Sequence, residues 1–120
     1  MSWMDSPSQH LLERYLDLSA KRQELISSNI ANVDTPGYRT RDIDFHGELA
    51  RAVSGDDSDT EPIVHEVHGL TARPDGNNVS VDREGLLLSE VQLQFNIAEQ
   101  LLKDNFKTLN LAINGGGSSS

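Results

Sequence analysis

The sequence contains no cysteine, which excludes disulfide bonds, thiolate nucleophiles and metal sites built on sulfur ligands. Aromatic residues are also scarce, at 5% of 120 residues, and hydrophobic residues of all kinds make up 36%. A chain of this length and composition can bury only a thin core. We therefore expect one small domain that is marginally stable by itself.

Basic residues are few: ten Lys and Arg stand against nineteen Asp and Glu, and the formal net charge is −9. Nucleic-acid binding needs basic side chains that displace counterions from phosphates, so no nucleic-acid partner is expected. No apolar run approaches the roughly 20 residues of a membrane span. Residues 1–7 lack the basic start and apolar stretch of a cleaved secretory signal. The sequence therefore predicts neither a direct membrane span nor a signal peptide.

The residues that could carry out chemistry are poorly arranged for it. His65 and His68 are three apart in a predicted strand and so fall on opposite faces, whereas the zinc-protease motif places two histidines four apart on a helix. Asp42 and Asp44 share a face, but no pocket-forming core is evident near them, and neighbouring arginines suit them as ion-pair partners. The sequence predicts no catalytic residue, no metal and no cofactor; a hydrolytic or metal enzyme is kept as an alternative.

Two long segments have apolar residues that recur every three or four positions, the pattern of a helix with one apolar face. They span residues 1–33 and 81–114. At 1.5 Å per residue such helices are too long to form compact globules of their own, so their apolar faces are expected to bury each other or a neighbour. The interface candidates are Leu12, Leu16, Ile26 and Ile30 in the first helix and Leu88, Val91, Phe95, Ala98, Leu102, Phe106 and Leu109 in the second.

The predicted fold is mainly α: two long terminal helices that pack as a coiled-coil-like pair, antiparallel or splayed, with a small irregular or β insert between them. Steps of four at Ala98, Leu102 and Phe106 break a strict heptad pattern. Packing between two helices rarely offsets the entropy of ordering so many residues, so we expect surplus apolar surface that neighbouring molecules cover. A helical hairpin that is stable as a monomer is the alternative.

A turn is predicted after the first helix, within an extended segment at residues 34–45. Pro36 disfavours helical geometry at Thr35, and Pro36-Gly37 suits the central positions of a type II turn. Asparagine side chains bond readily to nearby backbone, which suits the end of a helix, where carbonyls lose their partners. The expected structural turn consists of Asn29, Asn32, Thr35, Pro36 and Gly37.

The segment between this turn and the second helix is the least helical part of the chain. Asp75-Gly76 is typical of a hairpin turn, and Asp82 is the expected N-cap of the second helix, which Gly115 ends. The expected elements are an insert at 46–80 with a short helix at 47–53, an acidic linker at 54–62 and a hairpin that pairs 63–67 with 78–81, and finally a flexible Gly/Ser tail at 115–120.

Three blocks of sequence carry a resemblance to a known family. They are Ser-Asn-Ile-Ala-Asn-Val-Asp-Thr-Pro-Gly-Tyr at 28–38, Arg-Asp-Ile-Asp-Phe at 41–45 and Arg-Pro-Asp-Gly-Asn-Asn-Val at 73–79. The first block resembles flagellar rod and hook proteins in general, and the other two, with the short chain length, resemble the proximal rod subunits of the bacterial flagellar basal body. Gly85 departs from the family, whose members usually have Met there, and it weakens the first helical turn by up to about 1 kcal/mol relative to Ala.

The resemblance implies a structural component of the bacterial flagellum, part of the proximal rod that transmits torque from the membrane ring to the hook and filament. It implies a place in the basal body, in the periplasmic space, reached by type III export without a cleaved signal peptide. The implied partners are other flagellar rod subunits, the membrane-ring/rod adaptor and the export gate, with self-association in the rod. Two alternatives are kept: a small helical adaptor or chaperone of the flagellar type III export system, and a different rod subunit.

Overall fold

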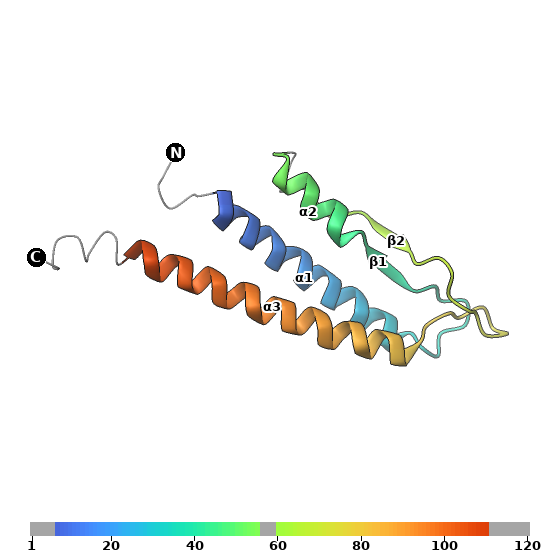
Figure 1. Ribbon diagram of the computed structural model, residues 1–120. Helices are drawn as coiled ribbons and strands as arrows, with labels where there is room; N and C mark the ends of the chain where they lie inside the picture. The colour runs from blue at the N-terminus through green and yellow to red at the C-terminus, as the bar shows by residue number, and fades with distance from the viewer. Residues whose placement is uncertain (1–6, 56–59, 111–120) are drawn as a thin grey trace, which may run out of the picture.

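The computed structural model describes residues 7–55 and 60–110, and it confirms the mainly helical fold. The molecule is elongated, measuring 71 × 27 × 17 Å along its principal axes. Figure 1 shows the two long helices side by side and antiparallel. In chain order the elements are α1 (Pro7–Ala31), β1 (Arg41–Ile43), α2 (Phe45–Val53), β2 (Val64–Glu66) and α3 (Val81–Asn110).

The helix α1 lies in the middle of the molecule. It contacts α3 on one side, and α2 and β1 on the other (Figure 1). Leu18 and Ser19 are both completely buried although successive helical residues point about 100° apart. The burial on α1 is therefore broader than the single face expected of a two-helix pair, because the insert covers a second face.

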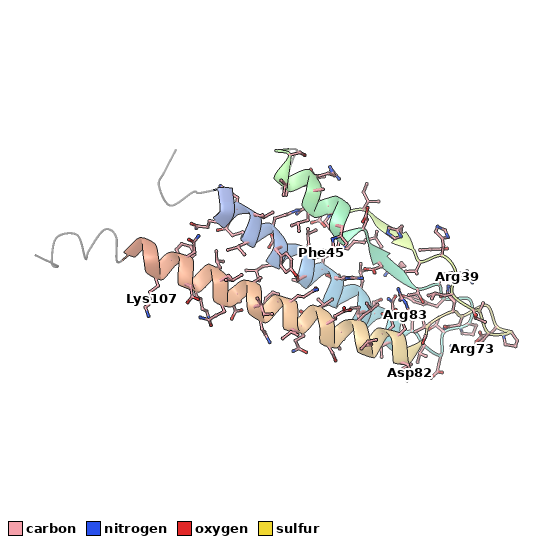
Figure 2. All side chains as sticks on the ribbon, in the orientation of Figure 1. Arg39, Phe45, Arg73, Asp82, Arg83 and Lys107 are labelled. Carbon is pink, nitrogen blue, oxygen red and sulfur yellow. The ribbon has the colours of Figure 1, made fainter. Side chains whose placement is uncertain are left out.

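The main hydrophobic core lies between α1 and the insert. It consists of Leu18 and Leu25 of α1 with Ile43 and Phe45 of the insert. The Phe45 ring meets the ring of Tyr15 edge to face, with 5.0 Å between the centroids. Figure 2 shows Phe45 between the start of α2 and α1. The insert is therefore packed onto α1 and shares its core.

A buried ion pair also fastens the insert to α1. Arg14 of α1 lies 3.8 Å from Oε1 of Glu48 in α2, and its Nη2 donates to the carbonyl of Thr60 at 2.9 Å. The other carboxylate oxygen of Glu48 accepts from the backbone N–H of Ile63 at 3.1 Å. Buried charges are tolerated when they are paired and hydrogen-bonded in this way. The pair brings α2 and residues 60–63 to the same face of α1.

The predicted strand at 63–67 is present as β2, but its predicted partner was wrong. β2 pairs antiparallel with β1, in a register that places Arg41 opposite Glu66 and Ile43 opposite Val64. Residues 78–81 do not form the second strand because Asn78 bonds to the segment after α1: its N–H donates to the carbonyl of Tyr38 at 3.3 Å and its Oδ1 accepts from the N–H of Thr40 at 2.6 Å. Val81 already begins α3. The chain after the turn at Asp75-Gly76 then runs beside the end of α1.

The helices α2 and α3 are capped by residues that the sequence analysis did not predict as caps. Asp44 caps α2 by accepting from the N–H of Gly47 at 3.1 Å, so this helix starts two residues before the predicted position. Ser80 caps α3, because its hydroxyl accepts from the N–H of Arg83 at 3.2 Å. Asp82 is therefore not the N-cap. It lies exposed in the first turn of α3, where a negative charge favours the helix dipole.

Some sequence predictions fall outside the described residues: the chain before residue 7, residues 56–59 of the acidic linker predicted at 54–62, the end of the second helix at Gly115 and the Gly/Ser tail at 115–120. Among the helices that are described, none combines the length and the apolar character needed to cross a bilayer.

Replacing Leu18 by alanine is expected to lower the free energy of unfolding by about 3 kcal/mol, because a completely buried side chain is removed and a cavity is left. Leu93→Ala is the matched control, at a residue that is 61% exposed, and should change the free energy by less than about 0.5 kcal/mol. Urea unfolding followed by circular dichroism measures both. Equal losses in the two variants would contradict the position of the core.

Candidate functional site

The loops that connect α1 to β1 and β2 to α3 meet at one end of the molecule, where α1 ends and α3 begins (Figure 1). We call residues 29–41 and 73–84 the corner. Figure 2 shows Arg39, Arg73, Asp82 and Arg83 gathered at this end. Arg39 Nη1 donates to the carbonyl of Gly76 at 3.2 Å, so even the exposed arginines join the two halves of the corner.

The first half of the corner contains the turn over residues 35–38. The N–H of Tyr38 donates to the carbonyl of Thr35 at 3.2 Å, and Gly37 has φ of 76°. This backbone conformation is strained for residues with a side chain, which explains a glycine at this position. The N–H of Gly37 donates to the carbonyl of Asp75 at 2.9 Å, so the turn is held against the second half of the corner.

Asn29, at the end of α1, is buried and uses every hydrogen-bonding group of its side-chain amide. Oδ1 accepts from the N–H of Arg41 at 3.1 Å and from the hydroxyl of Tyr38 at 2.9 Å. Nδ2 donates to the carbonyl of Arg41 at 2.9 Å and to Oε1 of Glu84 at 3.1 Å. An amide has two donors and two acceptor sites, so this one is fully satisfied. It joins the end of α1 to both β1 and α3.

Two further asparagines, Asn77 and Asn78, bind the second half of the corner to the first. Nδ2 of Asn77 donates to the carbonyls of Asn32 and Thr35, each at 2.8 Å, and so satisfies carbonyls just beyond the end of α1. Oδ1 of Asn78 accepts from the N–H of Thr40 at 2.6 Å. Both asparagines are buried, so the corner is a small polar core.

Glu84, in the first turn of α3, is the most unusual group in the corner because it is acidic and only 1% exposed. Oε1 accepts from Asn29 and from Nη1 of Arg83, the latter at 3.2 Å. Oε2 has no hydrogen-bond partner among the described residues. Burial raises the pKa of Glu84, and the negative charge of Asp42 adds to this, while Arg83, Asn29 and Arg22 act in the opposite direction.

The structure places all five residues of the predicted turn in the corner, while the partners that they bind were missed. Asn32 donates to the carbonyl of Ser28 at 2.8 Å and accepts from the hydroxyl of Thr35 at 3.0 Å, and Pro36 and Gly37 are exposed. The missed side chains bond beyond their immediate neighbours: Tyr38 reaches Asn29, nine positions away, and the other four reach residues 38 to 55 positions away. They are Tyr38, Thr40, Asn77, Asn78 and Glu84.

The predicted interface residues differ in how far the single chain buries them. Among them Ile26, Val91 and Ala98 are buried, and Phe106 is exposed. The side chain of Leu109 lies outside the described part of the chain. The half-buried members are Leu12, Leu16, Ile30, Leu88, Phe95 and Leu102.

A second set of apolar residues on α3 was not predicted. Leu86, Leu93, Ile97 and Leu101 are all more than half exposed, from 52% to 71%. Their spacings of seven, four and four put them on one face of the helix. We call them the outer stripe. At Ile97 and Leu101, the end of the stripe nearest the C-terminus of α3, it borders a groove of about 240 Å³ between α1 and α3. The groove is lined by Leu12, Tyr15, Gln94, Ile97, Ala98 and Leu101.

The outer stripe and the groove together form an apolar surface on the pair of long helices. Exposed apolar surface of this kind is typical of sites that bind a protein, a membrane or a ligand. The histidines considered as metal ligands, His65 and His68, are both exposed. Within residues 7–55 and 60–110 no three His, Asp or Glu side chains are grouped so that they could hold a metal ion.

Residues 16–39, which run from the middle of α1 through the turn, match the family model described as "Flagella basal body rod protein". The chain is also similar to three proteins named "Flagellar basal body rod protein FlgB". It is 32% identical to that of Borreliella burgdorferi, over 83% of this chain and 90% of the relative. The proteins of Salmonella typhimurium and Escherichia coli K12 are 31% and 32% identical, each over 84% of this chain and 88% of the relative.

Asn29→Ala is expected to lower the free energy of unfolding by about 2–4 kcal/mol, because the backbone of Arg41, the hydroxyl of Tyr38 and the carboxylate of Glu84 lose buried partners. The control is Asn96→Ala on the exposed surface of α3, which should leave stability unchanged or slightly higher because alanine is the better helix former. Urea unfolding measures both variants, and a loss below about 0.5 kcal/mol for Asn29→Ala would contradict the role of the amide.

Proposed function

Because this chain belongs to the family of flagellar basal body rod proteins that are named FlgB, we propose that it is a structural subunit of the rod in a bacterial flagellum. Its work is mechanical: it forms contacts with neighbouring subunits and passes torque along the shaft, without catalysis. The names of the relatives give no support to the alternative of an export adaptor or chaperone.

The observation that carries the proposal is the exposed outer stripe. Burial of a large aliphatic side chain contributes about 1.5–3 kcal/mol relative to full exposure, and α3 presents four such side chains on one face. A single chain has nothing further to cover them with in its described part. Neighbouring subunits that pack on α3 would gain the free energy of burying these side chains. Holding a subunit in the shaft costs entropy, so the gain exceeds this cost only if several such contacts form together.

The predicted interface residues and the outer stripe have different tasks in this proposal. Leu88, Val91 and Ala98 hold α3 on α1 within the subunit, and Leu93 and Ile97 face other subunits. The corner keeps the two helices in a fixed relation, so the stripe is presented at one angle. A contact surface that is rigid before assembly transmits load with little loss to internal movement, which suits a shaft.

The subunit also needs a position in the rod and a route to it. We place it in the proximal rod, in the periplasmic space, next to other rod subunits, further copies of itself, the membrane-ring/rod adaptor and the export gate. Type III export without a cleaved signal peptide is consistent with a small chain that has no disulfides to form and a thin core to unfold. The net charge of −9 favours solubility of the free subunit before it assembles.

Leu93→Asp is expected to prevent incorporation into the rod while leaving the isolated chain folded, because a charge would be buried at a subunit contact but is exposed in the free protein. The matched control is Gln92→Asp, which adds the same charge at the neighbouring exposed position. Mass spectrometry of detergent-extracted, salt-washed basal bodies, with swimming assays, measures both. Normal amounts of Leu93→Asp protein in basal bodies would refute the contact surface.

The same preparation tests the function as a whole. The unaltered chain is expected in basal bodies in a fixed ratio to the other rod proteins. Its absence from them, together with abundant protein in the cytosol, would contradict the proposal that it is a rod subunit.

A further inference from the structure

Glu84 lies at the joint between the two long helices. Its carboxylate is in the first turn of α3, and Oε1 is bonded to the amide of Asn29 at the end of α1. The same amide pairs with the backbone of Arg41 at the start of β1. The charge of Glu84 therefore acts at the point where α1, β1 and α3 meet.

The surroundings of this carboxylate compensate its charge incompletely. From α3, Arg83 bonds to Oε1 but is itself partly exposed, so solvent weakens the attraction. From α1, the positive charge of Arg22 is already engaged with Asp42, to which Nε and Nη2 donate at 3.1 and 3.0 Å. From β1, Asp42 contributes a like charge. Oε2 is enclosed with no hydrogen-bond donor among the described residues, so the ionised form leaves one buried carboxylate oxygen without a hydrogen bond.

We propose that Glu84 makes the corner a proton-dependent latch, in which the protonated side chain holds α3 on α1 firmly and the ionised side chain loosens the joint. Protonation at Oε2 removes the buried charge and leaves Oε1 as an acceptor for Asn29 and Arg83. The charge attraction to Arg83 weakens, but no hydrogen bond of the corner has to break. Ionisation restores the cost of burial, and the joint then opens more often to let water reach the carboxylate. This property belongs to the free chain and does not depend on its assembly into a rod.

The direction of the pH effect follows from the raised pKa of Glu84. A carboxyl group whose pKa is higher in the folded chain than in the unfolded chain favours folding most when it is protonated in both. Its contribution is therefore complete below the ordinary value of 4.5 and is lost as the pH rises through the raised value. The corner therefore becomes more stable as the pH falls from 7 towards the ordinary value of 4.5.

Hydrogen exchange on the full chain tests this latch, with the backbone amides of Thr40 and Arg41 as probes because both donate to side chains of the corner. After correction for the intrinsic pH dependence of exchange, we expect their protection to rise in the unaltered chain as the pH falls from about 7 to about 4, just below the ordinary value of 4.5, and the rise to be absent in Glu84→Gln. Glu90→Gln, which alters an exposed carboxylate on the same helix, is the matched control and should keep the rise.

Two results would overturn the latch: an equal rise in Glu84→Gln, or no rise in the unaltered chain. A second measurement needs no variant and remains decisive if Glu84→Gln folds poorly. Carbon NMR of the Glu84 carboxyl group is expected to give a titration midpoint in the folded chain above that of a short peptide covering residues 80–88. A midpoint equal to or below that of the peptide would contradict the proposal.

Discussion

The side-chain amide of Asn29 is the interaction on which the rest of the structure depends. It lies almost completely buried at the end of α1 and can be satisfied only if a backbone segment, a hydroxyl and a carboxylate come to it together. A buried amide left without partners costs about 1–3 kcal/mol for each group, so the fold has little freedom at this point. β1 must run past the end of α1, and α3 must start beside it.

The placement of α3 then decides which surface the molecule offers to others. Because the first turn of α3 is tied to Asn29 through Glu84, the helix returns along α1 with Val91 and Ala98 turned inward. Leu93 points away from α1, and Ile97 lies at the border between the packed face and solvent; both are more than half exposed. The polar corner and the apolar stripe are thus two consequences of one constraint, and an assembly that needs the stripe at a fixed angle needs the corner.

The regular parts of this fold could be predicted from the sequence, because helical periodicity is a local property. The spacing of Val91, Ala98 and Leu102 predicted the helix α3, and in the structure Val91 and Ala98 are buried. The outer stripe was missed since α3 has apolar residues on more than one face, and the pattern alone does not say which face the chain itself covers. Tertiary contacts decide that, and here the insert takes the opposite face of α1.

The corner was predictable in part. Pro36-Gly37 determines its own turn through backbone sterics, so this turn was found. Asn78 and Glu84 carry no such local information: their positions depend on Thr40 and Asn29, which are distant in the chain. A glutamate in a first helical turn ordinarily lies in solvent, and only the contact with α1 buries it. The predicted strand partner of β2 was wrong for the same reason, because the pairing of a three-residue strand depends on the residues that pack against it.

The central claim is that the outer stripe is free on the single chain and covered in the rod. Because the chain contains no cysteine, the variant Leu93→Cys carries one thiol at the middle of the stripe. Reaction with a maleimide should be complete in the isolated protein, blocked in purified basal bodies and restored once the rods are dissociated. Equal labelling of isolated protein and intact basal bodies would contradict the account.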